Sequence, residues 1–258
     1  MYFDSHTHLD ERCFDPDRED VFAQIRAAGV RLVMNVGSDL ASSERSVALA
    51  RQHAWIYASV GSHPDDAAAL DGALLDRYRA LAQEPCVRAI GEIGLDYYHE
   101  DVPRARQINA FEEQLALAQA LDLPVIVHER EAHGDAMDIV RRNPQARGVF
   151  HCFSGSPEMA LWLVERGWYI GFTGVVTFKN ARRAVEAVQA LPMERILIET
   201  DCPYMAPEPY RGKRNDSRYL PLIAAKIAQL KGLSPEEVGL RTTENACRLY
   251  GIADGSAL

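Results

Sequence analysis

Short apolar stretches alternate with amphipathic helical segments along the whole chain, and this alternation constrains the fold more than any other feature. The predicted strands cover residues 2–6, 31–36, 56–61, 87–92, 124–128, 148–151, 169–172 and 195–201. The predicted helices cover residues 18–29, 42–53, 69–83, 104–122, 132–143, 157–167, 180–190 and 218–231. Eight strands, each followed by a helix, predict an α/β protein with a parallel (β/α)8 TIM barrel.

Local signals at the two ends of this pattern favour one barrel over other α/β folds. Ser234, followed three residues later by Glu237, predicts an additional C-terminal helix that begins near Pro235. A doubly wound open sheet would need a glycine-rich phosphate loop after the first strand, whereas residues 8–12 read HLDER. The chain has 258 residues, which suits a single barrel. We therefore predict one domain over residues 1–258.

Charge and cysteine content narrow the class of protein. The formal net charge of −9 excludes a basic coat for packaging DNA, but bound divalent cations would still allow a phosphodiester substrate. Five cysteines without a C-x-x-C pair favour a reducing cytoplasm. No run approaches the roughly 18 apolar residues of a membrane span. We expect a cytoplasmic protein with no secretory signal, no membrane association and no obligate protein partner.

Metal-binding or ionisable side chains stand at the ends of six predicted strands, where barrel enzymes place their active sites. They are His6 and His8, His63, Glu92, His128, His151 and Asp201. His6 and His8 point to one face, because side chains alternate in extended backbone. Any one of these residues could be structural, but the four imidazoles other than His63 and the two carboxylates at one barrel mouth predict a two-metal hydrolytic site. A structural zinc site would instead use clustered cysteines.

Motifs in a fixed order run along almost the full length of the chain. They are DSHTHLD at 4–10, GEIGLDY at 91–97, PVIVH at 124–128, HCFSG at 151–155, ETDCPY at 199–204 and the late loop at 206–215. In these motifs the chain resembles the TatD-type metal-dependent hydrolases, nucleases within the wider amidohydrolase-like barrels. The opening H-x-H pair is generic to that superfamily, whereas the last two motifs together are typical of this family.

The resemblance implies a TIM-barrel hydrolase that binds two divalent metal ions, with nuclease activity on DNA among its members. By the family pattern, one ion is held by His6, His8 and Asp201. His128 and His151 hold the second ion, and Glu92 bridges the two. Carboxylates favour Mg or Mn and imidazoles favour Zn, so the ligand types leave the metal open.

Three of the remaining predictions concern residues near these ligands. Asp201 has a second expected role, as the base for a metal-activated water. His63 is expected to donate to a phosphate or leaving-group oxygen, with a structural histidine as the alternative. Glu199, two residues before Asp201, faces the same side and is expected to orient a ligand histidine from behind.

A basic loop follows the last strand and contains Arg211, Lys213 and Arg214. We expect it to bind phosphates of a polynucleotide, with a solvated basic turn as the alternative. The leading hypothesis is a divalent-metal-dependent deoxyribonuclease, a 3′–5′ exonuclease on single-stranded or frayed DNA. Hydrolysis of a small amide, ester or lactone on the same binuclear site is the alternative, although a carboxylated lysine would then be expected in place of Glu92. A metal-stabilised binding scaffold without activity is a third hypothesis.

Overall fold

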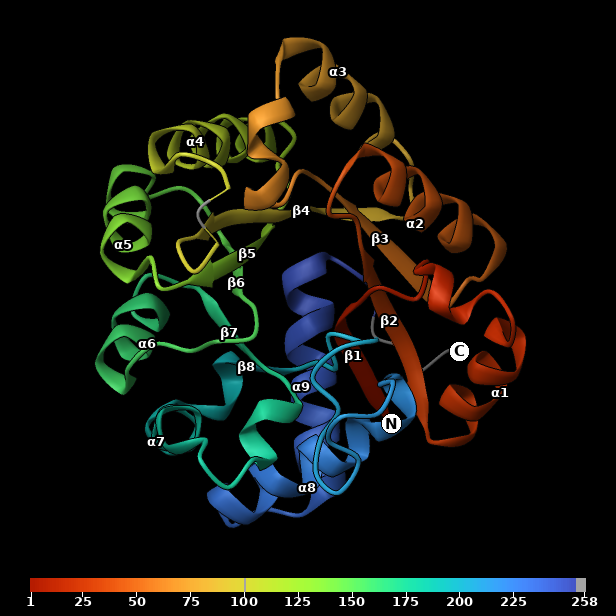
Figure 1. Cartoon of the computed structure of the whole chain (residues 1–258). Helices are drawn as coiled ribbons and strands as arrows, with labels where there is room; N and C mark the ends of the chain where they lie inside the picture. Colours follow the sequence, from red (N-terminus) through yellow and green to blue (C-terminus); the bar gives the residue numbers. More distant parts are fainter. Residues whose placement is uncertain (100, 254–258) are drawn as a thin grey trace. The chain divides into compact units, whose positions relative to one another are not determined.

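The computed structural model describes residues 1–99 and 101–253, and within them eight strands follow one another in a single sheet (Figure 1). The strands are β1 (Tyr2–Thr7), β2 (Val30–Val36), β3 (Ile56–Val60), β4 (Val87–Asp96), β5 (Val125–Arg130), β6 (Gly148–Phe150), β7 (Tyr169–Phe172) and β8 (Ile196–Ile198). Their order in the sheet is β1-β2-β3-β4-β5-β6-β7-β8. A helix follows each strand, so the predicted (β/α)8 barrel class is confirmed.

The helices also lie close to their predicted positions. They are α1 (Arg18–Ala27), α2 (Leu40–Gln52), α3 (Gly72–Leu81), α4 (Arg104–Ala120), α5 (His133–Arg142), α6 (Pro157–Val164), α7 (Arg182–Ala190), α8 (Leu220–Lys231) and α9 (Pro235–Tyr250). The predicted C-terminal helix is confirmed in α9, where the Ser234 hydroxyl accepts a hydrogen bond from the Glu237 backbone N–H at 3.1 Å. Across residues 1–99 and 101–253, none of these helices is long and apolar enough to cross a membrane.

The chain divides into two compact units, which we describe separately. The first unit comprises Met1–Asn35 and Cys152–Leu258, and the second comprises Val36–His151. One domain over residues 1–258 stays a prediction.

In the first unit, backbone pairing joins elements from opposite ends of the chain. β1 pairs in parallel with β2, β7 pairs in parallel with β8, and Thr7 forms a parallel bridge with Cys202 just beyond β8. Helix α9 packs on β1, where the rings of Phe3 and Tyr250 lie 5.9 Å apart. β8 is shorter than predicted: it ends at Ile198, and Asp201, three residues further on, adopts a left-handed backbone with φ of 55° that excludes it from extended structure.

In the second unit, β3 to β6 pair in parallel and carry α2 to α5. β4 is longer than predicted: it continues past Glu92 to Asp96, and Gly94 pairs with His128 of β5. A β-carbon at Gly94, where φ is +143°, would collide with the carbonyl oxygen of His128. Glycine therefore allows the close approach of β4 and β5 next to Glu92 and His128.

Candidate metal centre

Three predicted ligands come together where β1 meets the segment after β8, and we call them the first set: His6, His8 and Asp201. Two backbone hydrogen bonds align them, from the Asp201 N–H to the His6 carbonyl at 2.9 Å and from the His8 N–H to the Cys202 carbonyl at 2.8 Å. The Nε2 atoms of His6 and His8 lie 3.2 Å apart. Asp201 Oδ1 lies 3.7 Å from the first of them and 3.5 Å from the second.

This spacing fits a divalent metal ion. An ion bound tetrahedrally at about 2.0–2.2 Å separates its ligand atoms by about 3.3–3.6 Å. The three donor atoms of the first set are spaced by 3.2 to 3.7 Å, and they combine two imidazoles with one carboxylate. Such a donor set suits zinc, manganese and other first-row divalent ions.

Asp4 supports the first set from inside the unit. Its carboxylate is fully buried and accepts hydrogen bonds from the Thr200 N–H at 2.9 Å and the Thr200 hydroxyl at 2.6 Å. Burial outweighs these hydrogen bonds and raises the pKa of Asp4 to about 7. Asp4 thereby ties β1 to the residue that precedes Asp201. The sequence reasoning gave Asp4 no role, although its two-residue spacing from His6 placed it on the same face.

The second set consists of Glu92, His128 and His151, which come from three consecutive strands. Glu92 lies in β4, His128 lies in β5, and His151 directly follows β6. Glu92 Oε1 is 2.9 Å from His128 Nδ1 and 2.7 Å from His151 Nε2, and these two nitrogens are 3.3 Å apart. Three donor atoms thus lie together, and the two carboxylate–imidazole distances are hydrogen-bond lengths, shorter than the separation around a tetrahedral ion. A divalent ion would bind there with the three side chains slightly further apart.

The second set has a partner that the sequence reasoning missed. Asp96 lies two alternations beyond Glu92 in β4, and its Oδ2 is 3.0 Å from His128 Nε2. Burial alone would raise the pKa of Asp96, but contacts with His128 and with the backbone N–H groups of His99 and Tyr98 lower it to about 2. Burial by itself would lower the pKa of His128, whereas the carboxylates of Asp96 and Glu92 raise it. The signal for Asp96 was the spacing of alternate residues from Glu92.

His63 lies beside the second set. It caps the short helix η2 (Pro64–Ala69), and its Nε2 is 3.9 Å from Glu92 Oε1. Donor atoms of His63, Glu92 and His128 all lie within 4.8 Å of one another, so the geometry admits His63 as a ligand or as a neighbour of the ion. Its Nδ1 is 3.3 Å from the Asp65 N–H and 3.4 Å from Asp65 Oδ2.

Glu199 is fully buried in the first unit. Its Oε2 accepts a hydrogen bond from the Ser5 hydroxyl at 3.1 Å, and its Oε1 accepts one from the Cys152 N–H at 2.6 Å. Glu199 therefore fixes a residue of β1 and the residue that follows His151. Its expected role in orienting a ligand histidine stays a prediction.

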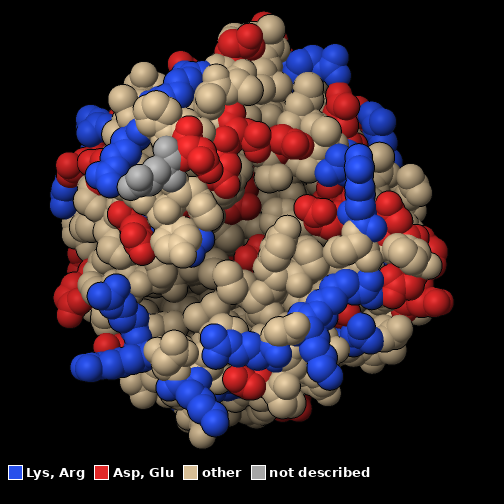
Figure 2. Space-filling view, viewed as in Figure 1, with Lys and Arg blue, Asp and Glu red and all other residues tan. Residues whose placement is uncertain are grey.

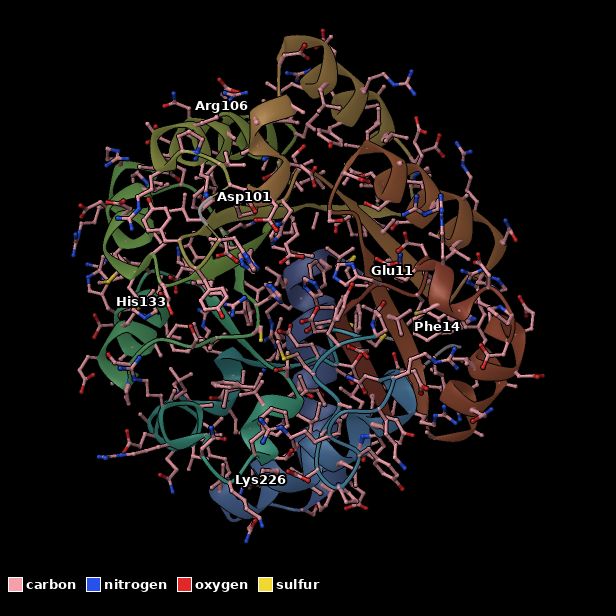
Figure 3. The ribbon with its side chains drawn as sticks, viewed as in Figure 1. Glu11, Phe14, Asp101, Arg106, His133 and Lys226 are labelled. Carbon is pink, nitrogen blue, oxygen red and sulfur yellow. The ribbon has the colours of Figure 1, made fainter. Side chains whose placement is uncertain are left out.

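The basic loop divides into an anchored residue and two exposed ones. Arg214 binds both carboxylate oxygens of Asp17 at 2.9 and 2.6 Å, and it lies over the ring of Phe14, which Figure 3 labels. Arg211 and Lys213 are exposed and lie over the rings of neighbouring aromatic residues. Figure 2 shows Lys and Arg side chains gathered over this part of the first unit. The phosphate contacts predicted for all three residues stay predictions.

Known proteins are similar to this chain in both sequence and fold. The model of a family described as TatD related DNase matches residues 3–251. The chain is 40% identical to YabD of Bacillus subtilis, an uncharacterized metal-dependent hydrolase, over 98% of this chain and 100% of that protein. It is 39% identical to a protein of Cronobacter turicensis named 3′-5′ ssDNA/RNA exonuclease TatD, over 96% of this chain and 97% of that one.

A solved structure agrees with these relationships. The crystal structure of the TatD homologue YJJV from Escherichia coli K12 superposes with a TM-score of 0.91 at 30% sequence identity. The match covers 97% of this chain and 98% of that one. The predicted hydrolase is thereby confirmed, and the hypothesis of a scaffold without activity is wrong. The chain belongs to the TatD family and is a metal-dependent hydrolase.

Proposed function

We propose that this hydrolase is a 3′–5′ exonuclease that cleaves phosphodiester bonds at the ends of single-stranded DNA. The observation that carries the proposal is the pair of imidazole–carboxylate sets, each of which brings two imidazole nitrogens and one carboxylate oxygen within 3.7 Å of one another. The exonuclease name of the Cronobacter relative supports the choice of a nucleic-acid substrate. Hydrolysis of a small amide, ester or lactone is the outcome that would replace it.

In this proposal the first set and the second set each hold one divalent ion, Mg, Mn or Zn. Bound divalent ions would polarise a water and stabilise the charge on phosphate oxygens. Glu92 has the central position of the second set, since its Oε1 faces both histidines of that set. We also propose that Glu92 bridges the two ions and that Asp201 acts as the base.

His63 supplies a hydrogen-bond donor beside the second set. The Asp65 backbone N–H donates to Nδ1, so a neutral His63 carries its proton on Nε2. A protonated His63 would pair its Nδ1–H with Asp65 Oδ2 and would also carry a proton on Nε2. In both states Nε2–H points toward the side of the second set that Glu92 occupies. It is suited to donate to a phosphate oxygen or to the leaving group.

Arg211 and Lys213 are proposed to bind phosphates of the strand beyond the scissile bond. Both side chains are exposed, and within residues 1–99 and 101–253 neither forms the kind of bidentate ion pair that holds Arg214 to Asp17. Contacts of this kind hold a polynucleotide without reading its sequence. The cytoplasmic location expected from the cysteines stays a prediction.

The test is hydrolysis of single-stranded oligonucleotides that carry a label at the 5′ end or at the 3′ end, with Mg, Mn or Zn added to EDTA-treated protein. We expect metal-dependent shortening of the 5′-labelled strand in single-nucleotide steps and immediate release of a labelled mononucleotide from the 3′-labelled strand. His63→Gln should lower the rate and leave metal binding unchanged. Inert DNA with metal-replete wild-type protein, together with turnover of an ester, amide or lactone, would select the alternative.

A further inference from the structure

The two carboxylate oxygens of Asp96 have different hydrogen-bond partners. The side chain is 2% exposed, and its Oδ1 accepts hydrogen bonds from the backbone N–H groups of Tyr98 at 2.9 Å and His99 at 3.1 Å. Its Oδ2 lies 3.0 Å from His128 Nε2. The turn after β4 thus fixes the carboxylate and directs Oδ2 toward His128.

The geometry of Asp96 decides which nitrogen of His128 carries a proton. A carboxylate oxygen accepts hydrogen bonds, so Nε2 of His128 must donate. The lone pair of a neutral imidazole then lies on Nδ1. Nδ1 is the atom that faces Glu92 Oε1 at 2.9 Å and His151 Nε2 at 3.3 Å. The arrangement therefore presents a ligating nitrogen to the second set.

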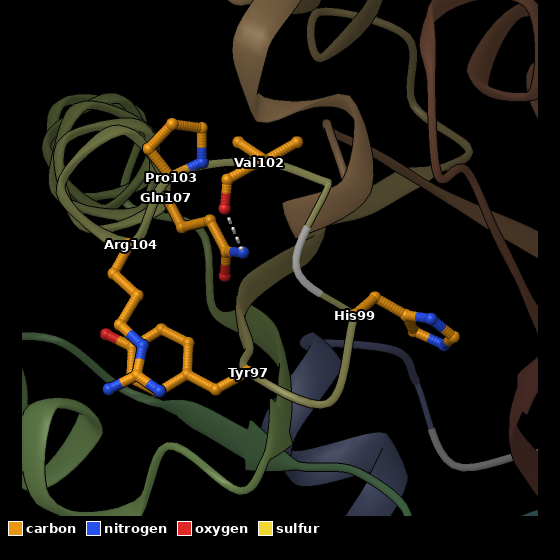
Figure 4. Close-up of a pocket in the computed structure, with 6 residues that line it drawn as sticks. All are labelled: Tyr97, His99, Val102, Pro103, Arg104 and Gln107. Atoms are coloured by element: carbon orange, nitrogen blue, oxygen red, sulfur yellow. Dashed lines mark hydrogen bonds between the residues drawn. The ribbon is translucent and has the colours of Figure 1, made fainter.

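Gln107 of α4 fixes the backbone of Asp96 in turn. Its side chain is 1% exposed and forms hydrogen bonds in both directions, because Oε1 accepts from the Asp96 N–H at 2.9 Å and Nε2 donates to the Asp96 carbonyl at 2.9 Å. Nε2 also donates to the Val102 carbonyl at 3.1 Å, as Figure 4 shows. A single amide thus joins α4, the end of β4 and the loop between them.

We propose that Asp96 is a positioning residue that keeps His128 in the Nε2–H form with Nδ1 toward the ion of the second set, and that Gln107 holds Asp96 in place. The proposal rests on the proposed function only in that the second set binds a divalent ion. Carboxylates behind ligand histidines fix the orientation of the ring and increase its basicity.

Asp96→Asn tests the proposal with almost no change in size. The Asn oxygen can still accept from the N–H groups of Tyr98 and His99, but its amide N–H2 then faces His128 Nε2. Nε2 of His128 must then accept a hydrogen bond. The proton of the neutral imidazole therefore moves to Nδ1, where it occupies the lone pair that would bind the ion. We expect zinc or manganese affinity at one of two sites to fall by about 10- to 100-fold, as for other residues behind metal ligands.

Titration calorimetry of EDTA-treated protein with zinc measures both sites, and 15N NMR of the zinc-loaded protein reports the proton on His128 Nε2. In the wild type we expect two bound ions and a proton on Nε2. In Asp96→Asn we expect one ion at wild-type affinity, which shows a folded protein, and loss of the Nε2–H signal. Gln107→Glu, which keeps the acceptor for the Asp96 N–H but loses the donor, should weaken the same site less.

Asp135→Asn is the matched control. Asp135 accepts a hydrogen bond from the Tyr97 hydroxyl at 2.6 Å in the same region and lies outside the ligand sets. We expect it to keep both affinities and the Nε2–H signal. Two ions bound by Asp96→Asn at wild-type affinity, with the signal retained, would overturn this inference and leave the proposed function intact. A wild-type protein that binds no ion at the second set would overturn both.

Discussion

The two ligand sets contain the same kinds of side chain, but they are positioned in different ways. In the first set, main-chain hydrogen bonds between β1 and residues 201–202 place His6, His8 and Asp201. In the second set, each ligand comes from its own strand, and the side chain of Asp96 orients His128. Backbone pairing tolerates many side-chain changes, whereas a buried side-chain network fails when one member changes its hydrogen-bonding character. The second set should therefore be the more sensitive to residues that never touch the ion.

The largest effect is expected from Glu92→Gln. Glu92 is the acceptor that both histidines of the second set face, so neutralising it removes the negative charge that an ion there requires. Activity on labelled single-stranded DNA should fall more than about 100-fold, beyond the range typical of residues behind ligands. Glu84→Gln is the control, because Glu84 lies in an exposed ion pair with Arg51. A variant at residue 92 that kept a tenth of wild-type activity would contradict the assignment.

Asp201→Asn tests the first set and should leave the second set filled. Asparagine tolerates the left-handed φ of 55° that residue 201 adopts, so the backbone between β1 and β8 should be kept. Calorimetry should show loss of one ion and retention of the other. Asp201→Ala should also lower the free energy of unfolding, by about 1 kcal/mol, because alanine is strained in that conformation. Loss of both ions in Asp201→Asn would mean that the two sets are not independent.

Asp4, beside the first set, gives the free energy of unfolding a pH dependence opposite in sign to that of Asp96, beside the second set. Its pKa is about 7 in the folded chain and about 3.9 when unfolded. Below about pH 4 both states are protonated. As pH rises, the unfolded state loses the proton first, so this contribution to stability falls until pH passes about 7.

Urea unfolding of EDTA-treated protein at pH 5 and pH 7 measures this difference. From pH 5 to pH 7, the free energy of unfolding of Asp4→Asn should rise relative to that of the wild type by on the order of 2 kcal/mol. Asp96 has the opposite effect on stability. Its pKa of about 2 contributes to the free energy of unfolding at neutral pH, and this contribution is lost only as pH falls below about 4. A constant difference between wild type and Asp4→Asn over this range would exclude the buried, protonated Asp4.

The smallest effects are expected in the basic loop. Arg211→Ala and Lys213→Ala should each raise KM a few-fold, leave kcat unchanged and reduce the salt slope of single-strand binding by about 0.7. Arg214→Ala should instead lower the free energy of unfolding only slightly, since its pair with Asp17 is partly exposed. If only Arg214→Ala changed the salt slope, Arg214 would bind phosphate and the roles proposed for Arg211 and Lys213 would be wrong.

Most of the fold was predictable because hydrophobic periodicity follows burial, and strands buried on both faces read as short apolar runs. The six candidate ligands were predictable because they stand at or near the carboxyl ends of the strands predicted from the sequence, and their role as ligands stays a prediction. The extension of β4 to Asp96 was not, because Gly91 and Gly94 lower the strand signal beyond Glu92.

Other features depend on tertiary contacts that no local pattern encodes. The left-handed backbone of Asp201 is accompanied by a hydrogen bond from its N–H to the His6 carbonyl of β1. The ion pair of Arg214 with Asp17 joins residues far apart in the sequence. The bridging role of Glu92 and the identity and number of the ions remain predictions, because they depend on the bound ions themselves.

The pairing of β1 with residues 201–202 also has a consequence for the order of events during synthesis. The second set lies within one compact unit, Val36–His151, and all its members leave the ribosome before residue 201 is made. The first set has no carboxylate until β8 returns to β1. Because domains of a chain begin to fold while it is still growing, we expect a nascent chain to acquire metal at the second set first. Metal would then bind the first set only after β8 has docked against β1.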